Sequence, residues 1–204
     1  MKSDKILYSI TLLAIVLLSF FLYSSRFYPL LNSDDALNVL MAHYYKLPDC
    51  FYCWGQDRGG TLIPLLSQIF IKLFGFSALF SVSLSNYLIL ILGFIGLSSL
   101  IKSKYSKVVF AIIWFLPFQR FVDITRFPIG VEYSLLGMAI YFICKIEDKQ
   151  MTCVFKRHAL LFMTMLTLIV SVWVSDLSLV SIVILIVVFC RHLHFIIHGS
   201  DFNS

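Results

Sequence analysis

Apolar runs of membrane-spanning length alternate with short polar stretches along the whole chain. A helix needs roughly 20 apolar residues to cross a hydrocarbon core about 30 Å thick. By this measure the pattern predicts about six transmembrane helices, at residues 6–23, 76–101, 108–118, 130–144, 159–174 and 177–197. The third and fourth runs are short, so we expect polar flanks shielded by the other helices to lengthen them. The pattern predicts an all-α polytopic membrane protein with a single domain over residues 1–204.

The first apolar run follows Lys2 and Lys5 and ends before Arg26. A cleaved signal peptide is the alternative for such a segment. The apolar core of a signal peptide usually has about 7–15 residues, and this run is longer. No clear small-x-small cleavage site follows it, so we expect a retained helix.

The longest predicted loop, residues 25–75, has the pattern of folded structure. Ser33 is suited to cap a helix, and Asp34 and Asp35 would lie in its first turn, where the helix dipole favours carboxylates. The residues that follow place an apolar stripe at i, i+3, i+4 and i+7: Leu37, Leu40, Met41 and Tyr44. This spacing predicts a short amphipathic helix lying on the outer membrane interface.

A second amphipathic helix is predicted from about Leu62 to Phe74. Pro64 suits its first turn, and Gly75 suits its C-terminal stop. Its polar stripe consists of Thr61, Gln68 and Lys72. A helix of this length with a polar stripe is expected to lie in the interface rather than to cross the membrane.

The stretch from Trp54 to Thr61, with the sequence WGQDRGGT, joins the two predicted helices. Gly59 and Gly60 are adjacent, and glycine allows backbone conformations and close approaches that other residues do not. Two interpretations stay open at this point: a tight turn before a helix, or a loop that binds a ligand.

Composition narrows the class of protein further. The chain is 60% hydrophobic and only 13% charged, with a mean hydropathy of +0.92, which excludes a soluble enzyme with a membrane anchor. Unbroken apolar runs disfavour a β-barrel, whose strands alternate apolar and polar residues. The net charge of +5 could suggest nucleic-acid binding, but the basic residues lie at the ends of apolar segments, as membrane topology requires.

The basic residues also predict an orientation. Cytoplasmic loops carry an excess of lysine and arginine. With a cytoplasmic N-terminus, ten of the sixteen basic residues lie inside: Lys2, Lys5, Lys102, Lys104, Lys107, Lys145, Lys149, Lys156, Arg157 and Arg191. Six crossings also place the C-terminus in the cytoplasm. Most carboxylates then lie with six basic residues on the outer face, as at a functional site, although each of them taken singly is more typical of an ordinary loop charge.

The order of these motifs resembles that of the GT-C glycosyltransferases. The resemblance is best from Ser33 to Phe76, over the acidic pair in Asp34-Asp35-Ala36 and an aromatic-Gly-Gln-x-x-Gly-Gly-x-Leu-x-Pro run that leads into the second amphipathic helix. It continues more weakly through Gly130-Val131-Glu132 and the stretch from Trp173 to Leu177. The most similar branch is the bacterial one related to protein O-mannosyltransferases and to the lipid A aminoarabinose transferase.

The resemblance implies transfer of a sugar from a polyprenyl-phosphate carrier to an acceptor outside the cytoplasm, with inversion at the anomeric carbon. By the family pattern Asp34 matches the base, and Asp35 stands where a second acid follows. Inverting transfer needs a carboxylate to accept the acceptor's proton and positive groups to stabilise the departing phosphate. Helix capping without chemistry is the alternative for either aspartate.

Further candidate substrate-binding residues lie along the outer face. Arginine grips phosphate oxygens in a bidentate way, which makes Arg58, Arg120 and Arg126 candidates, with snorkelling to lipid headgroups as the alternative. Gln56 and Gly59 belong to the glycine-rich loop. Glu132 and Asp176 begin predicted spans, where a charge needs a polar partner, either substrate or protein.

Cys50 and Cys53 form a C-x-x-C motif on the predicted outer face. A local disulfide or two free thiols are both compatible with it, and a membrane thiol-disulfide oxidoreductase is a further alternative. Such an enzyme generally needs a second outer cysteine pair, whereas Cys144, Cys153 and Cys190 are predicted near the cytoplasmic side. We assign no metal and no cofactor, although some GT-C relatives hold a divalent cation.

GT-C enzymes are usually longer, with more spans and often a C-terminal extracytoplasmic domain. The expectations are therefore a minimal enzyme, a truncated copy, or a subunit whose protein partner supplies the missing half. A non-catalytic lipid-binding protein of this fold is the main alternative to the transferase. The expected ligands are membrane lipid, a polyprenyl-phosphate-linked sugar and an unidentified acceptor, and the expected location is a bacterial inner membrane.

Overall fold

The computed structural model describes residues 2–28, 33–55, 58–118, 122, 125–146 and 154–187. This part of the chain is helical and contains no strand; an isolated antiparallel bridge joins Tyr52 and Gly60. The helices are α1 (Lys2–Tyr23), α2 (Ser33–His43), α3 (Leu62–Phe74), α4 (Ala78–Ser98), α5 (Lys104–Phe115), α6 (Ile129–Ile146) and α7 (Val154–Val174). A short apolar helix, Ser178–Val187, follows α7.

Four of these helices, α1, α4, α6 and α7, are long and apolar enough to cross a membrane. The predicted class, an all-helical protein with several apolar helices of membrane-spanning length, is therefore confirmed for the described residues. Two of the six predicted crossings coincide with shorter helices within the described residues, the 12-residue α5 and the Ser178–Val187 helix.

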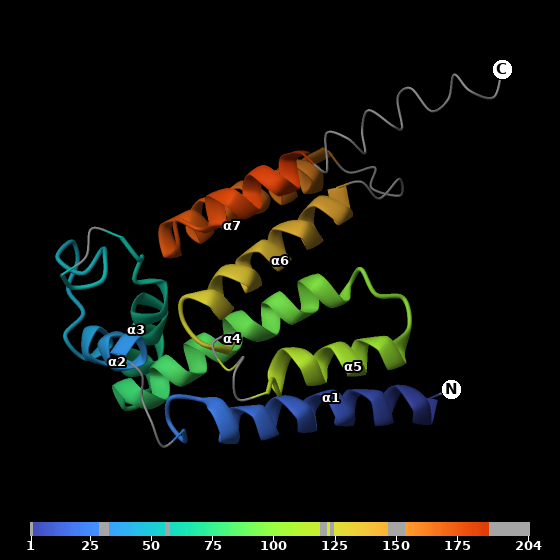
Figure 1. Ribbon diagram of the computed structural model, residues 1–204, viewed down its shortest axis with the longest axis horizontal. Coiled ribbons are helices and arrows are strands. Elements are labelled where there is room, and N and C mark those ends of the chain that lie inside the picture. The colour runs from blue at the N-terminus through green and yellow to red at the C-terminus, as the bar shows by residue number, and fades with distance from the viewer. Residues whose placement is uncertain are drawn as a thin grey trace.

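The long helices form a row in which each packs against the next (Figure 1). α1 lies beside α5, α4 and α6 follow, and α7 packs on α6. α2 and α3 lie together beside one set of helix ends, next to the beginnings of α4 and α6 and the end of α7, and the N-terminus lies at the other set of helix ends. The outer-face segments predicted from the sequence are thus grouped at a single end of the bundle.

Small residues allow α4 and α6 to pack very closely. A Cβ added at Gly93 would lie 2.4 Å from the Cα of Ser134, and one added at Gly96 would lie 2.4 Å from the carbonyl oxygen of Gly137. Close backbone approach of this kind replaces the hydrophobic driving force that water provides in soluble proteins, because lipid chains are as apolar as leucine. The α4–α6 contact is accordingly the most extensive between any two helices of the described chain.

A buried polar cluster connects α1 with α4 and α5. The hydroxyl of Ser19 lies 2.8 Å from that of Tyr87 and donates to the carbonyl oxygen of Phe115. The hydroxyl of Tyr87 donates to the carbonyl oxygen of Ser19 over 2.7 Å. Buried polar groups need such partners, so these contacts fix α1 against the bundle, although most of its surface is apolar and exposed.

α2 and α3 have bounds close to those predicted. The side of each helix that faces the protein contains both polar and apolar residues. α2 buries Asp35, Asn38, Met41 and Ala42. In the predicted apolar stripe of α2, Leu40 and Tyr44 are exposed. α3 buries its first turns, and the side chain of Gln68 donates to the carbonyl oxygen of Ala42 over 2.7 Å, which joins the two helices. Gly75 ends α3 in the left-handed conformation, with φ at 67°, as predicted.

Replacing Gly96 by alanine is expected to lower the thermal stability of the purified protein in detergent. The added methyl group would overlap the backbone of α6, and overpacking of this kind typically costs about 1–3 kcal/mol. Ile95→Phe is the matched control, because it adds a larger volume to a neighbouring residue that is 49% exposed. An unfolding temperature equal for Gly96→Ala and wild type would contradict this account of the α4–α6 contact.

Candidate functional site

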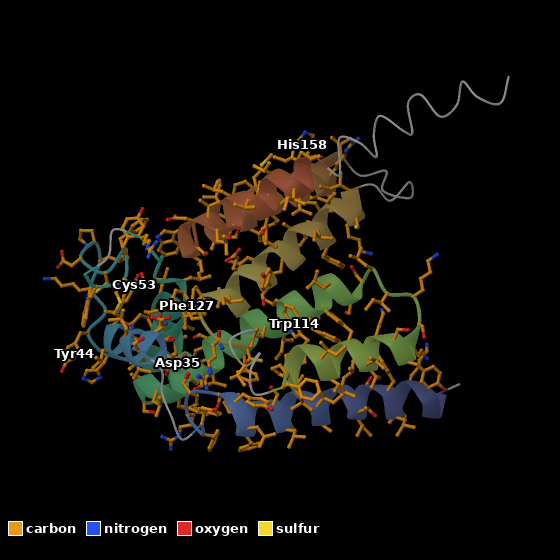
Figure 2. All side chains as sticks on the ribbon, viewed as in Figure 1. Asp35, Tyr44, Cys53, Trp114, Phe127 and His158 are labelled. Atoms are coloured by element: carbon orange, nitrogen blue, oxygen red, sulfur yellow. The ribbon has the colours of Figure 1, made fainter. Side chains whose placement is uncertain are left out.

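A pocket of about 350 Å³ opens where α2, the glycine-rich loop, the start of α6 and the end of α7 meet. Its lining includes Asp34 from α2, Arg58 and Gly59 from the loop, Phe127 from the segment before α6, and Asp176 after α7. Figure 2 shows the labelled residues Asp35, Cys53 and Phe127 together at this end of the bundle. We call this the polar pocket.

α2 contributes both a carboxylate and an amide to the polar pocket. Asp34 is exposed, in the first turn. Asn38 follows four residues later, so the two side chains lie on one face of the helix. The Asn38 amide donates to the carbonyl oxygen of Asp34 over 2.9 Å. Its own Oδ1 is buried with no hydrogen-bond partner among the described residues.

The glycine-rich loop turns back on itself to present Arg58. Gly55 and Gly59 have φ of 75° and 76°, in the left-handed region that glycine adopts at little cost. The backbone N–H of Cys53 donates to the carbonyl oxygen of Gly59 over 2.9 Å, which closes the turn. Arg58 is exposed on this turn and lines the pocket. The described residues on either side of positions 56 and 57 are thus held together by a backbone hydrogen bond, and two of them, Arg58 and Gly59, line a cavity.

Trp173, at the end of α7, holds this loop in place. The N–H of Gly60 donates to the carbonyl oxygen of Trp173 over 2.6 Å, and the Trp173 indole donates to the carbonyl oxygen of Phe51 over 3.2 Å. A Cβ at Gly60 would lie 2.5 Å from the indole ring. Only glycine permits this approach, so the second glycine of the pair is explained by packing.

Asp35 and Arg126 form a buried ion pair next to the pocket. The Arg126 Nε lies 3.7 Å from the Asp35 Oδ2, and the two side chains are only 10% and 7% exposed. The Arg126 guanidinium also lies over the ring of Tyr28, 4.3 Å from its centroid. Consecutive helix residues point about 100° apart, which separates Asp35 from the neighbouring Asp34. The ion pair joins α2 to the segment before α6 and to the chain after α1.

The structure thus brings together four of the residues predicted for the site and sets others apart. Asp34, Arg58, Gly59 and Asp176 line the polar pocket. Asp35 and Arg126 pair with each other. Glu132 is buried in the first turn of α6, outside the pocket lining. Gln56 and Arg120 lie outside the described residues.

Asn38 and Phe127 are among the pocket residues that were not predicted as ligand-binding. Asn38 could have been found from its spacing of four residues from Asp34 on one helix face. Phe127 carries no such signal, because its place in the pocket depends on where α6 packs.

Cys50 and Cys53 are free, buried thiols, so of the alternatives left open by the sequence the structure contains the thiol pair. Burial, together with the nearby Asp34 carboxylate, raises the pKa of Cys53 to about 11. A reactive redox cysteine needs the opposite shift, because the thiolate is the nucleophile. No group of three or more His, Cys, Asp or Glu side chains that could hold a metal ion occurs within the described ranges.

Comparison of the chain with protein-family models, curated proteins and solved structures finds no match. The chemistry of the polar pocket is therefore taken from its own side chains. Asp34 and Asp176 can accept protons, and the Arg58 guanidinium can bind anionic oxygens. Such a set suits a polar ligand that carries both hydroxyl and anionic groups.

The raised pKa of Cys53 predicts slow alkylation that accelerates only at high pH. In a variant that keeps Cys53 as its sole cysteine, the iodoacetamide reaction should titrate near pH 11, because the thiol stays protonated below its pKa. Adding Asp34→Asn removes a charge that disfavours the thiolate, so the midpoint should fall, while burial keeps it above the ordinary value of 9.0. A midpoint at or below 9.0 before Asp34 is changed would contradict this environment.

Proposed function

We propose that this protein is an inverting membrane glycosyltransferase of the GT-C type, which transfers a sugar from a polyprenyl-phosphate carrier to an acceptor hydroxyl. The observation that carries the proposal is the convergence of Asp34, Arg58 and Asp176 on the polar pocket, from three segments far apart in the sequence. Its volume of about 350 Å³ is within the range of small-molecule sites.

In the proposed reaction Asp34 acts as the general base. The acceptor hydroxyl gives its proton to the Asp34 carboxylate while its oxygen attacks the anomeric carbon. The bond from that carbon to the phosphate oxygen breaks, and its electron pair leaves with the polyprenyl phosphate. Arg58 stabilises the charge on the departing phosphate, and the exposed carboxylate of Asp176 accepts hydrogen bonds from sugar hydroxyls.

Asp35 and Arg126 have a different role in this proposal. Removing one partner of a buried ion pair typically costs about 3–5 kcal/mol, because the other charge is left uncompensated. We therefore assign both residues to positioning α2, and with it Asp34, and not to contact with the substrate.

The proposal includes a topology in the membrane. We propose six crossings with both termini in the cytoplasm of a bacterial inner membrane, and α2 and α3 lying at the outer interface. This orientation is supported by Lys5, Lys104, Lys107, Lys145, Lys156 and Arg157, which lie towards the helix ends opposite the polar pocket and outnumber the described basic residues near it. The reaction would then serve glycosylation of the cell envelope. A protein partner that completes the acceptor site is compatible with the same arrangement.

Asp34→Asn is expected to abolish sugar transfer while the protein still inserts and folds. Loss of a general base lowers the rate by about 10²–10⁴, and Asp34 is exposed, so its replacement leaves no buried group unpaired. The measurement is release of radiolabelled sugar from a panel of polyprenyl-phosphate sugars by protein in nanodiscs.

The matched control is Asp49→Asn, which removes an exposed carboxylate from the same outer segment, near Lys46 and outside the polar pocket. It should transfer sugar at the wild-type rate. Undiminished transfer by Asp34→Asn would remove the proposed base. Binding of the donor without any transfer by wild type would favour a non-catalytic lipid-binding subunit.

A further inference from the structure

A cavity of about 310 Å³ lies between four helices, away from the polar pocket, with which it has no lining residue in common. Its walls come from α4, α5, α6 and the Ser178–Val187 helix. Apolar residues dominate the lining, which contains no charged side chain and includes Leu97, Trp114, Leu136, Ile140, Ile184 and Leu185. We call this the lateral cavity.

The packing of the four helices explains the lateral cavity. A Cβ added at Gly137 would lie 2.8 Å from the Cγ of Leu97, so α4 and α6 are in close contact at the base of the cavity. α5 packs more extensively on α1 than on α4, so space remains on the side of α5 that carries Trp114. Tyr133 and Ile184 are 44% and 58% exposed. The cavity therefore opens to the surroundings of the bundle, which in a membrane are lipid chains.

The length and direction of the lateral cavity suit one acyl chain. Its lining on α6 extends from Tyr133 to Ile140, about 10 Å along the helix axis at 1.5 Å per residue. α6 is long and apolar enough to cross a membrane, so the cavity follows the direction of the surrounding lipid chains. The Trp114 indole donates to the carbonyl oxygen of Leu90 over 3.1 Å. Its polar atom is satisfied within the protein, and the ring offers apolar surface to a chain.

Two lysines lie on the face of α5 that carries Trp114. Lys107 precedes Trp114 by two turns of α5, so both side chains project from one face of the helix. Lys104 precedes Lys107 by one turn and shares this face. The surrounding stretch, residues 99–107, contains no carboxylate. An uncompensated positive charge therefore lies about 10 Å along α5 from the Trp114 ring, at the first turn, where the helix dipole also favours anions.

We propose that the lateral cavity binds one acyl chain of an anionic phospholipid whose phosphate group contacts Lys104 and Lys107. Charge complementarity selects this occupant, because clustered lysines beside membrane helices attract anionic headgroups. Trp114 is level with Leu90, about 12 Å along α4 from its end at Ser98, so the middle of the chain would contact the ring. The lipid belongs to the leaflet at the helix ends opposite the polar pocket (Figure 1), and this inference does not use the proposed function.

Fluorescence quenching by brominated lipid can locate the chain. The full-length protein is placed in phosphatidylcholine nanodiscs that contain a small fraction of lipid brominated at the middle of its acyl chains. Brominated phosphatidylglycerol should quench tryptophan fluorescence at about a tenfold lower fraction than brominated phosphatidylcholine, because it carries the net charge that the lysines attract. This selective quenching should be absent in Trp114→Phe. Equal quenching by the two lipids, or selective quenching that persists in Trp114→Phe, would overturn the proposal.

Two double variants test the contact with the headgroup. Lys104→Gln/Lys107→Gln should abolish the selectivity for phosphatidylglycerol. Lys156→Gln/Arg157→Gln removes two exposed positive charges at the same helix ends, from α7, which does not line the lateral cavity, and should be quenched like wild type. Selectivity that survives in Lys104→Gln/Lys107→Gln would overturn the assigned contact.

A second pair of variants tests the position of the chain without using Trp114. Ile184→Phe places a larger side chain in the cavity lining. Ile186→Phe is the control, because Ile186 is 56% exposed on the same helix but lies outside the lining. Native mass spectrometry counts the phosphatidylglycerol molecules that each purified variant retains. Ile184→Phe should retain one molecule fewer than Ile186→Phe, and equal numbers would overturn the proposed position even if Trp114→Phe fails to fold.

Discussion

The close approach of Gly60 to the Trp173 ring is the constraint on which the site depends. The loop before α3 and the end of α7 are more than one hundred residues apart in the sequence, and they meet where a Cβ at Gly60 would lie 2.5 Å from the indole. A backbone hydrogen bond of 2.6 Å reinforces this contact. Arg58 belongs to the loop and Asp176 follows α7, so the same contact that joins the two segments brings these opposite charges to one pocket.

The Asp35–Arg126 ion pair provides the second attachment, through the α2 residue next to Asp34. It is buried and also contacts Tyr28, so it links the chain after α1 to the chain before α6. A buried pair adds little net stability over apolar packing, but it is costly to break and it favours a specific geometry. Here the geometry turns Asp34, one residue earlier, towards the pocket. The two adjacent aspartates therefore have different roles: Asp34 lines the pocket, and Asp35 forms the ion pair.

Much of the helical framework could be predicted from the sequence, because apolar runs and helix-stop signals are local. Phe74 and Gly75 end α3 in the structure as predicted, and α7 ends at Val174 as predicted. The convergence of Asp34, Arg58, Gly59 and Asp176 agrees with their common assignment to one membrane face.

Tertiary partners could not be predicted in this way. Nothing local shows that Asp35 pairs with Arg126, or that Gly60 is needed for an indole ring over one hundred residues further along the chain. The apolar stripe of α2 was similarly incomplete as a guide to packing, since Asp35 and Asn38 are buried while Leu40 is exposed. Which face of a short helix is buried depends on the groups that the rest of the fold places opposite it, here Arg126.

Limited trypsin digestion of Gly60→Ala tests the central claim most directly, because the protease cuts after Arg58 in the loop that Trp173 is argued to hold. Gly55→Ala is a comparison variant: the same methyl group added to the same loop meets no atom within 4 Å there, although Gly55, unlike Gly60, has a positive φ, so this variant carries backbone strain without a clash. Cleavage after Arg58 should be several-fold faster in Gly60→Ala than in Gly55→Ala or wild type. Cleavage of Gly60→Ala at the wild-type rate would contradict the claim that the Gly60–Trp173 contact assembles the site.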